Sequence, residues 1–295
     1  MILRARAGAA ALLLLAGACV SERPAAVAPP PPSSGTVQPE PPGHFTFVGN
    51  AVQGGLLVGT APPHSVALLL DGQPVRLAPD GQFLIGFDRD APPGVRIEAV
   101  LADGRRVVHD LVVAVRQWDV QSLPTLPRGT DPTPEFLARR KDELARIAAA
   151  RAFVSNSGGW RQGFAWPVAG RVSGVFGSQR IYAGEPGSPH NGVDIARPTG
   201  TPVAAPADGV VVLAAQLPFT LEGKLLIIDH GMGLNSAFLH LSRIDVAEGQ
   251  AVTRGQIVGA IGTTGRSTGA HLHWGMRLGE ARIDPQLLAG AMPAP

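Results

Sequence analysis

The sequence predicts a mostly β protein with two all-β regions joined by a helix. With 37 glycines and 28 prolines in 295 residues, the chain is rich in turns, and only 5% of it is aromatic. Turn signals such as Asp71-Gly72 and Asp80-Gly81 recur between short apolar runs. Residues 160–290 contain no long helical pattern. We therefore expect an N-terminal small β-sandwich, a connecting helix and a C-terminal all-β sandwich or half-open barrel.

Residues 1–18 have the features of a signal peptide: two arginines precede an apolar run too short to span a membrane. The only cysteine, Cys19, directly follows Leu15-Ala16-Gly17-Ala18. This arrangement resembles the cleavage box of lipoproteins, in which the cysteine becomes lipidated and N-terminal. Ala16-Gly17-Ala18 is also a site for ordinary signal peptidase. The sequence thus leaves open a lipid-anchored and a soluble secreted protein.

The stretch 19–42 is rich in proline and poor in apolar residues, so we expect an extended tether without a packed core. Such a spacer would hold a domain away from a membrane anchor at Cys19. Arg4 and Arg6 account for the formal net charge of +2. The pI near 9.2 therefore does not indicate a nucleic-acid partner or a membrane-surface patch.

Residues 43–118 are expected to form the small sandwich. Apolar runs at 66–70, around 83–85 and at 107–115 are the best strand candidates. Three histidines lie here without the spacing of metal ligands, and we interpret them as structural or surface residues: His44, His64 and His109. No catalytic motif is visible, so this region is expected to act as a binding domain, as a spacer or as a cover for the catalytic domain.

Residues 119–159 are expected to be a linker containing one helix. Thr133 is a good N-cap, Pro134 suits the first helical position, and the helix should end near Phe153. Its apolar stripe is predicted to consist of Leu137, Leu144, Ile147 and Ala148. We expect this helix to pack on the C-terminal region, with residues 155–159 as a flexible joint.

Residues 160–290 are expected to form short strands between glycine-rich turns. The candidates are 202–215, 224–229, 234–241, 256–261 and 271–278. The segments 179–189 and 216–223 are predicted to be irregular loops, where functional clefts usually lie.

Five of the eight histidines lie between His190 and His273, and their spacing indicates a metal site. His190-x3-Asp194 and His271-x-His273 supply imidazoles and a carboxylate, the usual donors to a catalytic zinc with an open position. On a strand, His271 and His273 would point to one face. There is no His-Glu-x-x-His helix, so the base must come from elsewhere, and His240 is available. The pattern predicts a zinc hydrolase site.

Three motifs together resemble the signatures of the lysostaphin-type zinc metalloendopeptidases, the LytM-like enzymes with a duplicated hybrid motif fold. They are His190-x3-Asp194, Phe238-Leu-His240-Leu-Ser242 and Gly265-Arg-Ser-Thr-Gly-Ala-His271-Leu-His273-Trp274. The resemblance extends from about Phe164 to Leu288. Members of this family cut peptide cross-links in bacterial cell walls, and the resemblance implies a groove between loops with zinc on its floor.

The resemblance implies that one Zn²⁺ per chain is held by His190, Asp194 and His273, and that His240 and His271 are catalytic. Zinc lowers the pKa of its water to about 7, so an imidazole with a pKa near 6.5 can accept that proton. The other imidazole can stabilise the oxyanion. The sequence does not settle which histidine is the base. His230 begins a turn and is interpreted as structural, or as a support for the ligands.

These patterns favour a zinc endopeptidase of the cell envelope or periplasm that hydrolyses cross-links or stem peptides of peptidoglycan. A non-catalytic wall-binding or amidase-activating protein of the same fold typically lacks one or more of these residues, whereas none is missing here. A peptidase that acts on proteins is a third possibility. Still open are the bond cut, D-Ala to a diamino acid or a glycine bridge, and the need for an envelope protein as regulator.

Overall fold

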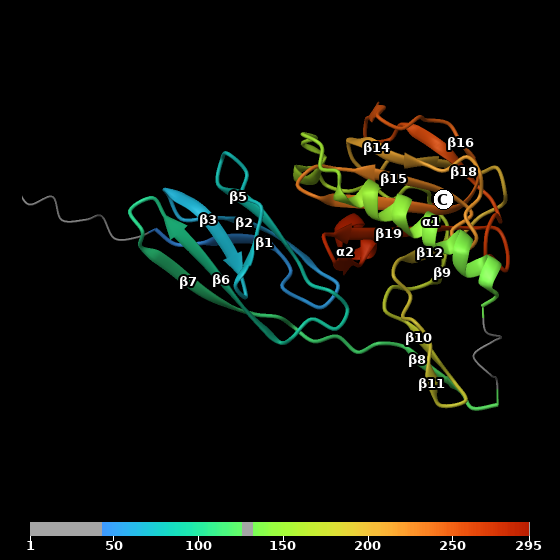
Figure 1. Ribbon diagram of the computed structural model, residues 1–295, viewed down its shortest axis with the longest axis horizontal. Coiled ribbons are helices and arrows are strands. Elements are labelled where there is room, and N and C mark those ends of the chain that lie inside the picture. The colour runs from blue at the N-terminus through green and yellow to red at the C-terminus, as the bar shows by residue number, and fades with distance from the viewer. Residues whose placement is uncertain (1–42, 126–131, 295) are drawn as a thin grey trace, which may run out of the picture. The chain divides into compact units, whose positions relative to one another are not determined.

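The computed structural model describes residues 43–125 and 132–294, and it confirms the predicted mostly β fold class (Figure 1). The predicted signal peptide, Cys19 and the predicted tether lie outside the described residues. None of the helices in the described ranges combines the length and apolar character needed to cross a membrane.

The N-terminal region is a sandwich of two small antiparallel sheets. One sheet has the order β1-β2-β5, with β1 at Thr46–Gly49, β2 at Leu56–Thr60 and β5 at Gln82–Gly86. The other has the order β4-β3-β6-β7, formed by Gln73–Pro74, Ser65–Leu70, Gly94–Leu101 and Arg106–Val112. Phe83 from the first sheet and Ile97 from the second are completely buried in one shared core. Burial of these inward-facing side chains stabilises the sandwich.

A ten-stranded antiparallel sheet dominates the C-terminal region. Its main path is β17-β14-β15-β16-β19-β12-β9, formed by Ala251–Val252, Gly209–Ala214, Lys224–Asp229, Leu234–Ile244, His271–Leu278, Val193–Ala196 and Arg171–Gly174. Off this path, β13 (Pro202–Ala204) pairs with β18 (Ile257–Ile261), β18 also pairs with β16, and β20 (Ala281–Ile283) pairs with β19. The short helix α2 at Pro285–Ala289 follows. The sequence missed β9 and β12, because four-residue strands between turns carry too little periodicity.

Strand β15 is buried on both faces. Leu226 and Ile228 belong to the main core, whereas Leu225 and Ile227 face a second core that includes residues of helix α1 (Pro134–Ala152). The connecting helix therefore covers one face of the central sheet, as Figure 1 also shows.

The buried stripe of α1 differs from the prediction. Glu143, Ile147 and Ala150 face the sheet, while Leu137 and Leu144 are 53% and 49% exposed. Ala148 is exposed as well. The reason is that Glu143 accepts hydrogen bonds from the backbone N–H and the hydroxyl of Thr220, which offsets the cost of burying its carboxylate.

Two segments that were predicted to be irregular are ordered by hydrogen bonds. In the joint 155–159, the backbone N–H and the hydroxyl of Ser155 both donate to Asp229 Oδ2, at 2.8 and 2.6 Å. In the loop 179–189, β10 (Gln179–Tyr182) pairs with β11 (Glu185–Pro186) and, in parallel, with β8 (Val120–Leu123) of the linker. The irregular loop 179–189 was a wrong prediction, because long-range partners leave no local signal.

The docking of α1 leads to a stability prediction. Ile147→Ala should lower the free energy of unfolding by about 2–5 kcal/mol, because a side chain that is only 6% exposed leaves a cavity. Leu137→Ala on the same helix should change it by about 0.5 kcal/mol or less. Urea unfolding followed by circular dichroism measures both. Equal losses for the two variants would contradict the observed orientation of α1.

Candidate metal centre

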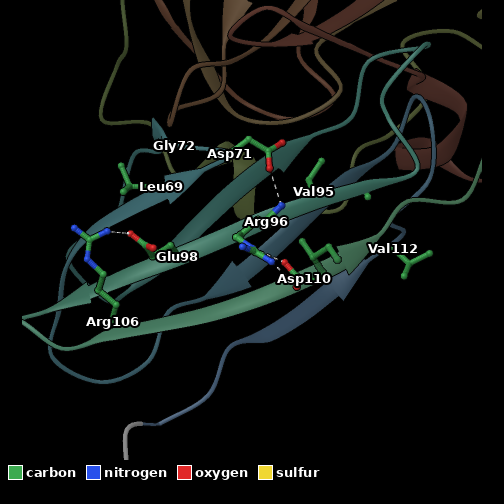
Figure 2. A pocket seen from close by; sticks show the side chains of 11 residues that line it. Leu69, Asp71, Gly72, Val95, Arg96, Glu98, Arg106, Asp110 and Val112 are labelled. Atoms are coloured by element: carbon green, nitrogen blue, oxygen red, sulfur yellow. Dashed lines mark hydrogen bonds and ion pairs between the residues drawn. The ribbon is translucent and has the colours of Figure 1, made fainter.

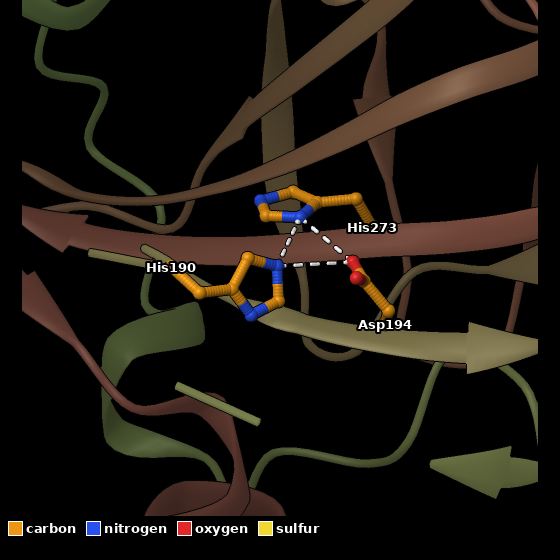
Figure 3. Close-up of side chains that lie close together, drawn as sticks. All are labelled: His190, Asp194 and His273. Carbon is orange, nitrogen blue, oxygen red and sulfur yellow. Dashed lines mark hydrogen bonds and ion pairs between the residues drawn. The ribbon is translucent and has the colours of Figure 1, made fainter. Parts of the chain in front are cut away.

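Three side chains converge at the junction of β12 and β19. Asp194 on β12 lies directly opposite His273 on β19 in the antiparallel register, and His190 precedes β12. Asp194 Oδ1 is 2.9 Å from His273 Nδ1 and 3.1 Å from His190 Nε2, and the two ring nitrogens are 3.0 Å apart. Figure 3 shows all three side chains pointing toward one another. Among the described residues, this is the one group of three or more potential metal ligands that meets at a point.

The tautomer of His190 shows that this cluster favours a cation. His190 Nδ1 lies 3.0 Å from the carbonyl oxygen of Val175, which can only accept, so this nitrogen carries the proton. His190 Nε2 therefore presents a lone pair to Asp194 Oδ1 and His273 Nδ1. Lone pairs that converge at about 3 Å repel unless a proton or a metal ion lies between them. Two imidazole nitrogens and one carboxylate fit a divalent transition metal.

Two glycines make room for this approach. A Cβ at Gly192 would lie 2.5 Å from the carbonyl oxygen of Trp274 and 2.7 Å from His273 Nε2. A Cβ at Gly174 on β9 would lie 2.5 Å from Asp194 Oδ2. Because such contacts are far too close, only glycine lets the backbone come this near to the two side chains.

The electrostatics of the cluster are dominated by Asp194. Burial would raise the pKa of this carboxyl, but hydrogen bonds with His190 and His273 outweigh it and hold the pKa well below its usual range. Burial also tends to lower the pKa of His190, and the neighbouring Asp194 reverses this, so that the pKa is raised. His273 is more deeply buried, and burial lowers its pKa. Asp194 is therefore an anion at any physiological pH.

His271 and His240 lie beside the cluster with their outer nitrogens fixed. His271 Nδ1 lies 2.8 Å from the carbonyl oxygen of Gly269, and His240 Nδ1 lies 2.8 Å from that of Thr264. Each carbonyl requires a proton on Nδ1, which leaves the Nε2 lone pair free. His271 Nε2 is 3.8 Å from Asp194 Oδ1, and the His240 and His271 rings are 4.9 Å apart. Burial lowers the pKa of His240, so this ring is neutral at pH 7.

The backbone of His240 is bent out of the regular strand. His240 has φ of +64°, a value that non-glycine residues rarely adopt, in the middle of β16. The register of β16 against both β15 and β18 shifts around this position. Such a bulge re-aims a side chain, and here it brings the ring of His240 to within 6.4 Å of that of His273.

His230 lies apart from the cluster and is completely buried. Its Nδ1 donates to the carbonyl oxygen of Asp208, and the hydroxyl of Ser236 donates to its Nε2, both at 2.8 Å. Trp274 Nε1 also donates to Ser236 Oγ, at 3.3 Å. Burial lowers the pKa of His230 to about 4, so it is neutral and serves in the hydrogen-bond network beneath β19.

The other histidines of the described ranges lie in the N-terminal sandwich, which also has a surface hollow. This hollow has a volume of about 690 Å³ and lies on the face of β6 and β7 (Figure 2). Its charged side chains are already paired: Arg96 with Asp110, and Arg106 with Glu98. No histidine lines it, so it offers no alternative metal centre.

Sequence reasoning named the five side chains that meet at this site, but it missed what holds them. The carbonyl groups of Val175, Thr264 and Gly269 set the three tautomers. Every residue has a carbonyl, so no sequence signal could have identified them.

Comparisons with known proteins agree with this site. Residues 188–285 match the model of Peptidase family M23. The chain is 35% identical to the peptidoglycan DD-endopeptidase ShyA of Vibrio cholerae over 197 residues, 64% of this chain and 41% of that protein. It is 37% identical to the DD-carboxypeptidase/endopeptidase Mpg of Neisseria meningitidis over 125 residues, 42% of this chain and 28% of that protein. The chain thus spans less than half the length of these curated relatives.

A solved structure extends the likeness beyond the site. The crystal structure of a Pseudomonas aeruginosa protein assigned to peptidase M23 has 31% sequence identity and a TM-score of 0.63, covering 82% of this chain and 96% of that one. Fold and site define a mostly β protein with a candidate metal centre of two histidines and one aspartate. The chain belongs to peptidase family M23.

The cluster leads to a prediction about metal content. His190→Ala and Asp194→Ala should each empty the site, because two remaining protein ligands cannot hold the ion against water and buffer. Elemental analysis after dialysis should find one divalent metal ion per wild-type chain and almost none in either variant. His64→Ala, which removes a histidine outside the cluster, is the control. Stoichiometric metal in both cluster variants would show that these residues are not the ligands.

Proposed function

We propose that this protein is a zinc-dependent endopeptidase that hydrolyses peptide cross-links or stem peptides of bacterial peptidoglycan. The observation that carries the proposal is the convergence of three ligand atoms within about 3 Å, with two further imidazoles beside them. The relatives ShyA, a peptidoglycan DD-endopeptidase, and Mpg, a DD-carboxypeptidase/endopeptidase, support the reaction class and the substrate.

His190 Nε2, Asp194 Oδ1 and His273 Nδ1 would hold one Zn²⁺. The donor set favours zinc over calcium or magnesium, which prefer oxygen ligands. When bound, zinc supplies Lewis acidity, which lowers the pKa of water and polarises a peptide carbonyl. The negative charge of Asp194 balances part of the charge of the ion.

His271 and His240 are proposed to move the protons. Each has its Nδ1 proton committed to a backbone carbonyl, so each can accept a proton at Nε2 without rearranging. One ring would take the proton of the attacking water at Nε2. The other would donate a hydrogen bond from Nε2 to the oxyanion of the tetrahedral intermediate in its doubly protonated form, because its Nδ1 proton stays on the backbone carbonyl. His240 is buried and His271 is partly buried, which strengthens these interactions by excluding water.

We also propose a domain organisation and a location in the cell envelope. Residues 1–18 act as the signal peptide and 19–42 as the tether, with lipid on Cys19 as the membrane anchor. Residues 43–118 form the small β-sandwich, 119–159 the linker with its helix and 160–290 the peptidase domain.

The proposed roles predict two kinds of variant. His273→Ala should lose both zinc and activity, whereas His271→Ala and His240→Ala should keep zinc and lose about 10²–10⁴-fold in rate, the usual cost of removing a general acid or base. Zinc content and the release of peptide fragments from purified peptidoglycan sacculi are measured side by side. His109→Ala in the N-terminal sandwich should match the wild type in both.

Two outcomes would contradict these roles. A metal-free His271→Ala protein with zinc retained by His273→Ala would mean that the assignments on β19 are reversed. Sacculi left intact by wild-type protein with a full complement of zinc would rule out the proposed substrate.

The anchor leads to a separate prediction. Cys19→Ser should move the protein from the membrane fraction to the soluble envelope fraction, because the lipid chains that hold it at the bilayer are lost. Fractionation with immunoblotting measures the shift, and intact-mass analysis of the membrane form should find acyl chains on Cys19. An unmodified Cys19 in that form would disprove lipid anchoring.

A further inference from the structure

A cavity of about 200 Å³ lies between helix α1 and the sheet face that carries the metal cluster. His273 and Asn191 line it on the side of the cluster, and Ala237 and Gly275 of β16 and β19 line it along the sheet. Arg151, in the last turn of α1, also lines it. Because one ligand residue of the cluster borders this cavity, a group bound in it belongs to the part of a substrate close to the reacting bond.

The cavity is strongly cationic. Its lining contains one carboxylate, Glu222, and four arginines: Arg140, Arg151, Arg277 and Arg282. Glu222 is fully engaged, because Arg140 binds both of its oxygens, at 2.5 and 2.6 Å. The cavity therefore offers positive charge that no acidic side chain of its own lining is left to neutralise.

Arg151 differs from the other three arginines in having no partner. Arg277 donates to the side chain of Glu280, and Arg282 lies 3.6 Å from the carboxylate of Asp88. Within residues 43–125 and 132–294, Arg151 makes no hydrogen bond or ion pair. A partly buried guanidinium with five unused donors is costly, since it loses hydration without gaining a partner.

The electrostatic surroundings add to this cost. Burial, together with the nearby Arg277, lowers the pKa of Arg151 to about 10, which still leaves the side chain charged at neutral pH. A cation in the last turn complements the helix dipole, but an exposed side chain would do that equally well. A carboxylate that enters the cavity would match the planar fork of the guanidinium. It would supply the missing ion-pair partner and hydrogen bonds in place of the lost hydration.

We propose that Arg151 is a specificity residue that binds a free carboxylate of the substrate next to the scissile bond. This inference rests on the proposed peptidase function and adds the substrate class. In a cross-link between D-Ala and a diamino acid, the diamino acid carries a carboxylate of its own beside the amide that is cut. A glycine bridge has none. Arg151 therefore selects the carboxylate-bearing cross-link, and it does so from the linker, outside the matched segment 188–285.

The test uses two synthetic peptides that share the same scissile amide and differ only in a free carboxylate or a carboxamide beside it. The wild-type protein should cleave the carboxylate peptide with a kcat/KM about 10- to 100-fold higher, the range for a hydrogen bond to a charged group. Arg151→Gln should lower the rate for the carboxylate peptide alone and so abolish the preference. Arg151→Lys, which keeps the charge but loses the fork, should retain part of it.

Lys141→Gln is the matched control, because it removes one positive charge from an exposed position of the same helix. It should leave both rates unchanged, and all variants should keep one zinc per chain. Equal wild-type rates on the two peptides would overturn the role of Arg151 while leaving the peptidase function intact. So would an Arg151→Gln variant that slows both peptides equally. Failure of zinc-loaded wild-type protein to cleave either peptide would overturn the proposed function and this inference with it.

Discussion

Three potential metal-ligand atoms directed at one point are the constraint on which the rest of this structure depends. Asp194, His190 and His273 approach to about 3 Å only because their backbones are held rigidly from outside the cluster. The antiparallel pairing of β12 with β19 places two of them face to face. Gly192 and Gly174 remove the Cβ atoms that would otherwise occupy the same space. A proton or a metal ion between these atoms stabilises the arrangement, which the backbone already holds in place.

Backbone carbonyls fix the tautomers of three histidines around this anionic centre. The Nδ1 atoms of His190, His240 and His271 each face a carbonyl oxygen, which fixes one tautomer and directs the Nε2 lone pair inward. Burial disfavours the charged form of His240 further. A site built in this way needs little reorganisation when a proton moves, which is the physical basis of preorganised catalysis.

The linker helix is part of the same construction. Glu143 of α1 accepts a hydrogen bond from the backbone N–H of Thr220. Arg140 of the same helix forms an ion pair with Glu222, two residues after Thr220. The carbonyl oxygen of Glu222 in turn accepts a hydrogen bond from the backbone N–H of His240, at 2.8 Å. The helix therefore supports the loop that positions one of the two proposed proton carriers. The same helix contributes Arg151 to a cavity that His273 also lines, so that the linker contributes both support and charge.

Some features of this protein follow from the sequence by itself, because they depend on local chemistry. The N-cap at Thr133 and the proline after it predicted the start of α1, and the His-x3-Asp and His-x-His spacings predicted which side chains meet. Turn dipeptides between apolar runs predicted a mostly β chain. Periodicity and spacing are properties of neighbouring residues, so they can be recognised in the sequence without knowledge of long-range contacts.

Only the tertiary structure decided the features that depend on distant partners. The register that sets Asp194 opposite His273, the left-handed backbone of His240 and the order in residues 155–159 all arise from pairings across many residues. The burial of Glu143 in place of Leu144 also depends on a distant residue. Thr220 donates a hydrogen bond to the buried carboxylate, whereas the apolar pattern alone predicts that leucine is buried. Arg151 is the clearest example: in the sequence it is one more charge near the end of a helix. Only the packing of α1 on the sheet places it in a cavity that His273 also lines, without a hydrogen bond or ion pair to the described residues.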